Sequence, residues 1–198
     1  MNGFTRSKSR QIALIAIFAA LVVVLQVFGS NFKIGTVSFS FVLVPIVLGG
    51  MVGGVGVGAA LGAVFGIVTI VMGATGADGF TQYLLTNAPV GTILVCLIKA
   101  TAAGAVSALA FGLTKKKNTL AATFVAAIVA PVVNTGIFIV GMLCMKSTVL
   151  SLMAASGLGE DVIYFLFIGC AGINFLVELG LNLVLSPALY RVMKTVLK

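Results

Sequence analysis

The chain is built from apolar runs long enough to cross a bilayer, and its charged residues stand mostly at the ends of those runs. Apolar residues make up 61% of the 198 residues, and charged residues only 8%. A soluble domain carries about 25% charged residues, and a helix needs about 20 consecutive apolar residues to cross a bilayer. The sequence therefore predicts an all-α integral membrane protein with one domain, residues 1–198. We expect six transmembrane helices, at about residues 11–28, 37–51, 56–72, 88–113, 120–145 and 162–189.

The distribution of positive charge indicates how these helices cross the membrane. The net charge is +8, and the cations cluster before the first run, between the fourth and fifth runs, and after the last. Six crossings place all three clusters on one face, and an excess of Lys and Arg marks the cytoplasmic face. We therefore expect both termini to be cytoplasmic. The clusters are Arg6, Lys8 and Arg10; Lys115, Lys116 and Lys117; and Arg191, Lys194 and Lys198.

The sequence lacks residues and motifs that several functional classes require. The sequence contains no histidine, which is the commonest general base and metal ligand. Its three cysteines form no CxxC pair, so we expect no metal site. P-loop, GxSxG and HExxH motifs are also missing. We expect no enzymatic activity and no cofactor, which leaves a small binding or transport subunit, or a membrane scaffold or small channel.

Small residues recur along two of the expected helices. Gly58, Gly62 and Gly66 repeat every four residues, which places them on one face where another helix backbone can approach closely. The earlier Gly50 and Gly54 belong either to this stripe or to the join between the second and third helices. On the first helix, Ala13, Ala16 and Ala20 form a smaller stripe of the same kind.

A few polar residues fall inside the apolar runs, where they are costly and usually face a cavity or a partner. Asn174, Glu178 and Asn182 are spaced by four, so they share one helix face. Lys99 and Glu178 either form an intramembrane ion pair or contact a ligand. Asn134 follows Pro131, which fits either a cavity lining or a kink with an interhelical hydrogen bond.

Four polar side chains cluster before the fourth helix, as recognition of a small molecule requires. They are Gln82, Tyr83, Thr86 and Asn87. Asn87 also fits a helix cap, because Pro89 suits the first helical turn.

Three local sequences carry a resemblance to a known family. They are the basic and alanine-rich start Arg10-Gln-Ile-Ala-Leu-Ile-Ala-Ile-Phe-Ala-Ala, the segment Val37-Ser-Phe-Ser-Phe-Val-Leu-Val-Pro45-Ile-Val-Leu-Gly, and Thr86-Asn-Ala-Pro89. In this order, across six expected spans, the chain resembles the substrate-binding membrane subunits (S components) of energy-coupling factor (ECF) vitamin transporters. The region of helices 2 to 4 is similar to the pantothenate-type and related members.

This resemblance implies a high-affinity binding component of an ECF-type importer, in a bacterial cytoplasmic membrane. It would take a water-soluble vitamin from the outer face and dock on a transmembrane coupling subunit driven by two cytoplasmic ATPases. The resemblance implies that Ala13, Ala16 and Ala20 face the coupling subunit. It also implies that the segments 29–36, 73–87 and 146–161 cap the pocket.

Two lysines in the capping segments, Lys33 and Lys146, either hold a ligand carboxylate or extend to the membrane interface. The full set of expected substrate-binding residues is Lys33, Gln82, Tyr83, Thr86, Asn87, Asn134, Lys146 and Asn174.

Overall fold

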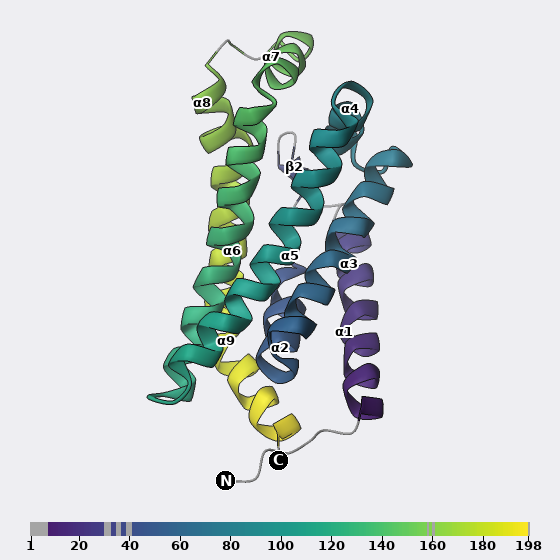
Figure 1. The fold of residues 1–198 in the computed structure, drawn as a ribbon. Coiled ribbons are helices and arrows are strands. Elements are labelled where there is room, and N and C mark those ends of the chain that lie inside the picture. Colours follow the sequence, from purple (N-terminus) through teal and green to yellow (C-terminus); the bar gives the residue numbers. More distant parts are fainter. Residues whose placement is uncertain are drawn as a thin grey trace.

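Long uncharged runs form long helices, which lie side by side in a bundle (Figure 1). The computed structural model describes residues 8–29, 33–34, 37–38, 41–157, 159 and 161–197. The bundle contains α1 (Lys8–Gly29), α3 (Val55–Ala74), α5 (Pro89–Thr114), α6 (Thr119–Cys144) and α9 (Ile173–Leu197), with the shorter α2 (Leu43–Gly53). Because each helix satisfies its own backbone hydrogen bonds, this is an arrangement that a bilayer tolerates.

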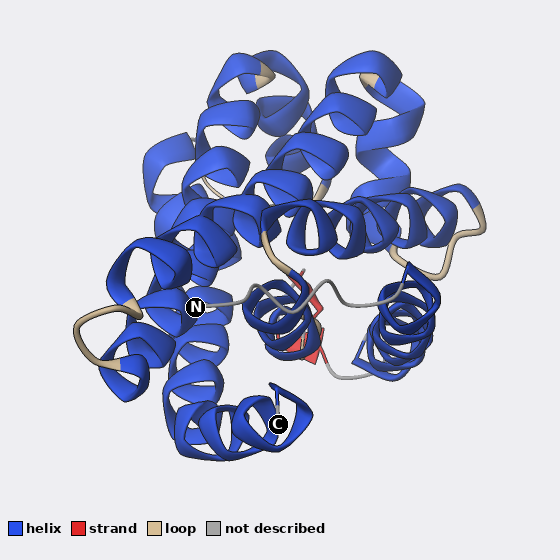
Figure 2. Cartoon of the chain, turned by 60° about the horizontal axis from the view of Figure 1, so that its bottom comes forward, coloured by secondary structure: helices blue, strands red, loops and turns tan. Residues whose placement is uncertain are grey.

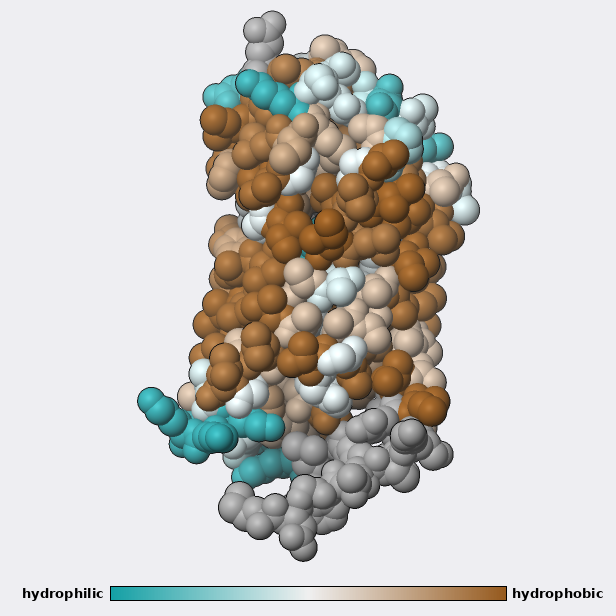
Figure 3. Space-filling view, in the orientation of Figure 1, coloured by the Kyte–Doolittle hydropathy of each residue, from teal (hydrophilic) through white to brown (hydrophobic). Residues whose placement is uncertain are grey.

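Four helical segments are long and apolar enough to cross a membrane. They are Val55–Ala74, Pro89–Thr114, Thr119–Cys144 and Val162–Thr195, and two shorter apolar helices, Ile15–Gly29 and Leu43–Gly53, accompany them. Figure 3 shows a broad hydrophobic band between two more polar ends of the molecule. The six apolar helices fall in the same order as the six runs of the sequence.

The second helix is shorter than expected. The sequence predicts it from Val37, but α2 begins at Leu43, and Val37 instead lies in a two-residue strand. Pro45 explains this start, because in the first turn its missing N–H needs no partner, whereas in a helix interior it would break a hydrogen bond. The strands β1 (Lys33–Ile34) and β2 (Val37–Ser38) pair antiparallel and lie beyond α2 when the molecule is viewed from its lower end (Figure 2).

Two segments expected as loops contain short helices. α4 (Gly79–Asn87) lies between α3 and α5, and α7 (Lys146–Ala155) follows α6. α7 buries Val149, Leu152 and Met153, whose spacing places them on one face against a small hydrophobic core that also includes Leu84 of α4. Both helices stand at the end of the bundle opposite the start of α1 (Figure 1).

The glycine stripe of α3 packs against α5, as the sequence predicts. A Cβ added at Gly58 or Gly62 would overlap a backbone carbonyl of α5, and one added at Gly66 would lie 2.7 Å from the oxygen of Cys96. Gly104 of α5 makes the reciprocal approach to Gly58. Gly54 belongs to the join, because its φ of +88° at the junction of α2 and α3 suits glycine.

The last membrane-length segment combines α8 (Val162–Tyr164), a π-helix η1 (Phe165–Gly172) and α9. A π-helical turn is wider than an α-helical one and often stands at a functional site. Here it directly precedes Asn174 and Glu178. The sequence predicts this whole segment as one helix but does not indicate that its middle part is a π-helix.

Candidate functional site

A cavity of about 80 Å³ lies among α1, α3, α4, α5, α6 and α9. Among the described residues, α2 contributes nothing to its lining, since α2 packs its buried side chains into the hydrophobic core nearer the other end of the bundle. The lining comprises Gln26, Phe65, Thr69, Asp78, Phe80, Thr81, Leu84, Thr92, Val95, Cys96, Lys99, Asn134, Phe138, Met142, Asn174 and Glu178.

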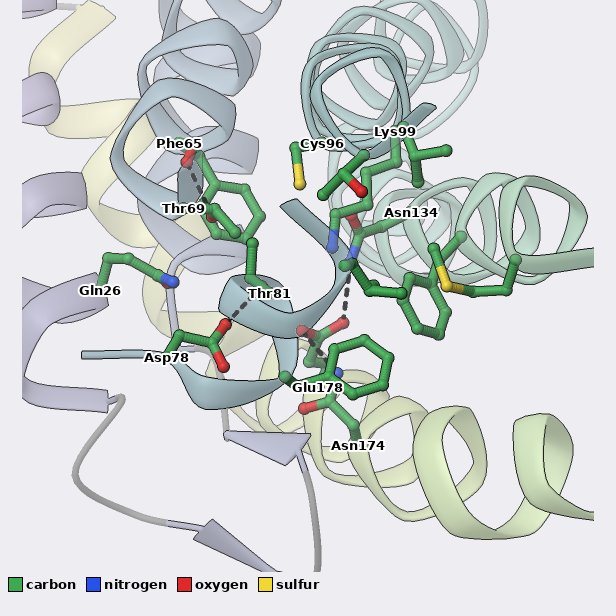
Figure 4. A pocket seen from close by; sticks show the side chains of 16 residues that line it. Gln26, Phe65, Thr69, Asp78, Thr81, Cys96, Lys99, Asn134, Asn174 and Glu178 are labelled. Carbon is green, nitrogen blue, oxygen red and sulfur yellow. Dashed lines mark hydrogen bonds between the residues drawn. The ribbon is translucent and has the colours of Figure 1, made fainter. Parts of the chain in front are cut away.

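Glu178 is the centre of the polar part of this cavity. Its side chain is 1% exposed, and its two carboxylate oxygens accept from different residues (Figure 4). Asn134 Nδ2 of α6 donates to Oε2 at 3.4 Å, and Asn174 Nδ2 of α9 donates to Oε1 at 3.2 Å. Burying a carboxylate is expensive unless donors surround it. Two amides from two helices supply those donors here.

Two side-chain to backbone hydrogen bonds follow Glu178 along α9. Asn182 Nδ2 donates to the backbone oxygen of Glu178 at 2.8 Å, and Ser186 Oγ donates to the backbone oxygen of Asn182 at 2.7 Å. Both side chains are buried. The prediction that Asn174, Glu178 and Asn182 share one face is therefore confirmed.

Lys99 of α5 lines the same cavity and lies against aromatic rings. Its Nζ is 5.2 Å from the ring centroid of Phe138 and 5.9 Å from that of Phe65. Within the described part of the chain, its ammonium makes no hydrogen bond. Its charge acts on Glu178 electrostatically. The ion pair of these two residues stays a prediction.

One wall of the cavity comes from the start of α4. Asp78 stands at the N-cap of α4, and its Oδ2 accepts from Thr81 Oγ1 at 2.6 Å. Phe80 and Leu84 complete this wall, and the ring centroid of Phe80 lies 6.1 Å from that of Phe138, another lining residue. The expected capping role of segment 73–87 thus has a geometric basis, since four of its residues line the cavity.

Asn134 and Asn174 are the two expected substrate-binding residues that line the cavity, and Lys99 and Glu178 join them. The polar cluster of α4 behaves differently. Thr86 and Asn87 are exposed and donate to backbone oxygens of their own helix, those of Gln82 and Tyr83. These four residues, and Lys146 at the start of α7, lie outside the lining. Lys33 lies in β1, with its side chain outside the described part of the structure.

Sequence reasoning missed Gln26, Asp78 and Thr81 as lining residues. Gln26 is a polar side chain within an apolar run, so the criterion that identifies Asn134 also applies to it. Asp78 is a residue type favoured at the N-cap of a helix, which is a signal for α4 itself. The phenylalanines carry no such signal, because the chain contains 14 of them.

Two further observations concern partners and metals. Ala13, Ala16 and Ala20 are exposed along α1, beside outward-facing Ile12 and Ile17. They are therefore accessible to a partner helix.

Among the described residues, no group of three or more Cys, Asp or Glu is placed to hold a metal ion.

Comparison with known proteins identifies one family. The model of the family described as "ECF transporter, substrate-specific component" matches residues 10–190, which is nearly the whole chain. No curated protein sequence matches the chain significantly.

Proposed function

Because the chain belongs to the family of ECF transporter substrate-specific components, we propose that it binds a water-soluble vitamin or related micronutrient in the cavity around Glu178. Members of this family are transport-binding subunits rather than enzymes, and they work with a transport module of transmembrane and ATPase subunits. Together with the apolar helices, this membership makes the chain a multi-pass membrane protein.

The observation that carries the proposal is the polar cavity inside an otherwise apolar bundle. Carboxylate, amide and ammonium groups converge there from α5, α6 and α9. A scaffold or a packing interface has no need for such groups, which cost free energy at this depth. A site that recognises a polar molecule does need them, with aromatic rings to fill the remaining surface.

The six-crossing topology is part of the proposal. The end of the bundle that holds the start of α1 and the end of α9 also holds five exposed cations (Figures 1 and 3). The short helices α4, α7 and α8, which begin at or next to Asp78, Lys146 and Asp161, stand at the opposite end. Following the positive-inside rule, we propose that the basic end is cytoplasmic and that α4 lies at the outer face, with the protein in a bacterial cell membrane. The five cations are Lys115, Lys116, Lys117, Arg191 and Lys194.

The outer half of the bundle receives the ligand in this orientation, since α4 and its Asp78 cover the cavity there. The sequence resemblance favours pantothenate within the class of vitamins. A scaffold or small channel without a high-affinity ligand remains the competing function, and family membership argues against it.

A thermal-unfolding screen of the purified protein in detergent tests the proposal. A ligand held by the native state raises its stability by mass action, so one vitamin at micromolar concentration is expected to raise the melting temperature. Pantothenate, riboflavin, folate, nicotinate, thiamine and biotin form the panel. Co-purification with a transmembrane coupling subunit and ATPases is expected from the native host. Failure of both would favour the scaffold or channel.

A further inference from the structure

Lys99 and Glu178, two of the charged groups of the lining, differ in what they can offer a ligand. The Lys99 ammonium has three N–H donors, and its contacts in the described structure are with the rings of Phe65 and Phe138. Glu178 can only accept when ionised, and it holds the amides of Asn134 and Asn174 by their NH₂ groups.

The orientation of these amides follows from the carboxylate. Since Glu178 accepts from both Nδ2 atoms, each amide oxygen must point away from it. Asn134 Oδ1, Asn174 Oδ1 and Gln26 Oε1 are indeed buried without a hydrogen-bond partner within the described part of the chain. Buried polar atoms are almost always paired. All three residues line the cavity, so this region is rich in acceptors and short of donors.

The remaining charged group does not alter this polarity. Asp78 also lines the cavity and accepts from Thr81 Oγ1, so it is a further acceptor. The described lining therefore contains two carboxylates and one ammonium. A ligand that offered only acceptor groups would be repelled by Glu178 and Asp78, and a ligand with only donors would leave Lys99 without an anion.

We infer that the ligand is a compact dipolar molecule, with an anionic group at Lys99 and hydroxyl or N–H donors at Glu178, Asn134 and Asn174. This inference rests on the proposed binding function and specifies the chemical class of its substrate. The cavity of about 80 Å³ is smaller than the pockets of about 300–1,000 Å³ that hold drug-sized ligands, which favours a compact molecule.

Matched probes test whether the protein recognises an anionic group on the ligand. Binding of pantothenate, biotin and nicotinate to the full-length protein is compared with that of their uncharged partners pantothenol, biotin methyl ester and nicotinamide, and with thiamine and riboflavin. The expected result is that the best ligand is a carboxylate with donor groups, bound at least about tenfold more tightly than its uncharged partner.

Two variants assign that preference to Lys99. Lys99→Met keeps the length of the side chain and its contact with the rings. It is expected to bind the carboxylate ligand and its uncharged partner equally. Lys99→Arg retains the charge and is expected to retain the preference. Asn174→Ala removes an amide beside Glu178 and is expected to weaken the binding of the charged and the uncharged probe by the same factor. The unliganded melting temperature of each variant shows that it is folded.

The outcomes separate the inference from the proposed function. Equal binding of the charged and uncharged partners by the wild type, or tightest binding of thiamine or riboflavin, would overturn the inference and leave the vitamin-binding function standing. Absence of binding by every probe, with no small molecule released from the native protein on denaturation, would overturn both.

Discussion

Glu178 is held by amide groups from two helices, which makes its contacts both local and long-range. Asn174 lies one turn before it on α9, whereas Asn134 approaches from α6 and ties the two helices together. The contact from α6 is the one that depends on the fold, because 44 positions separate the two residues in the chain. A change at Glu178 should therefore affect both stability and ligand binding.

Glu178→Gln is expected to destabilise the protein by about 1–3 kcal/mol, because the new NH₂ group would face an amide that can only donate in this orientation. Thermal unfolding in detergent measures the change. Thr195→Ala is the control on the same helix, since Thr195 is exposed and its hydroxyl donates to the backbone oxygen of Arg191 on its own helix. Equal melting temperatures for the two variants would contradict the role given to Glu178.

At the scale of the helices, the close approach of α3 and α5 fixes one wall of the cavity. Their small residues face each other along the interface, so the two backbones come into contact where larger side chains would separate them. Phe65 and Thr69 of α3 and Cys96 and Lys99 of α5 stand beside this contact and line the cavity. The positions of these lining groups therefore depend on the glycines.

Gly62→Ala is expected to cost about 1–3 kcal/mol, because its Cβ would overlap the backbone carbonyl of Ala100 and push the helices apart. Gly56→Ala is the matched control on α3, since a Cβ there meets nothing within 4 Å. That control should leave stability unchanged or slightly raised, because Ala favours a helix over Gly. Melting temperatures that fall equally in both variants would contradict the packing argument.

The whole molecule separates its ligand site from its expected partner surface. The cavity lies among the helices of the bundle, whereas Ala13, Ala16 and Ala20 lie exposed on the outside of α1. Among the side chains of α1 that the structure describes, only Gln26 near its end reaches the cavity lining. Ligand binding and assembly should therefore be separable by mutation.

A bulky residue at Ala16 or Ala20, such as Ala16→Trp, is expected to abolish co-purification with the coupling subunit and to block uptake. It should leave the ligand affinity within about twofold, because the cavity is on the inner side of the bundle. Val184→Trp is the control, since Val184 is 77% exposed on the different helix α9. Loss of ligand binding along with assembly would contradict the assignment of this face.

Much of the fold follows from the sequence because the bilayer allows few alternatives. An apolar run must form a helix there, so the number and order of the apolar helices are visible in the chain. The four-residue spacings of Gly58, Gly62 and Gly66, and of Asn174, Glu178 and Asn182, likewise predict shared faces. The late start of α2 and the helices α4 and α7 are harder to predict, since they depend on one proline and on short amphipathic patterns.

The sequence by itself determined the helical class, the packing face of α3 and the polar residues that had to face something other than lipid. The tertiary structure alone decided which of them meet. Asn134 and Asn174 converge on Glu178, whereas Thr86 and Asn87 turn back to their own helix. Periodicity specifies the direction of a side chain from its own helix axis. Which helix stands opposite is set by packing among all the helices, and no single run of sequence contains that information.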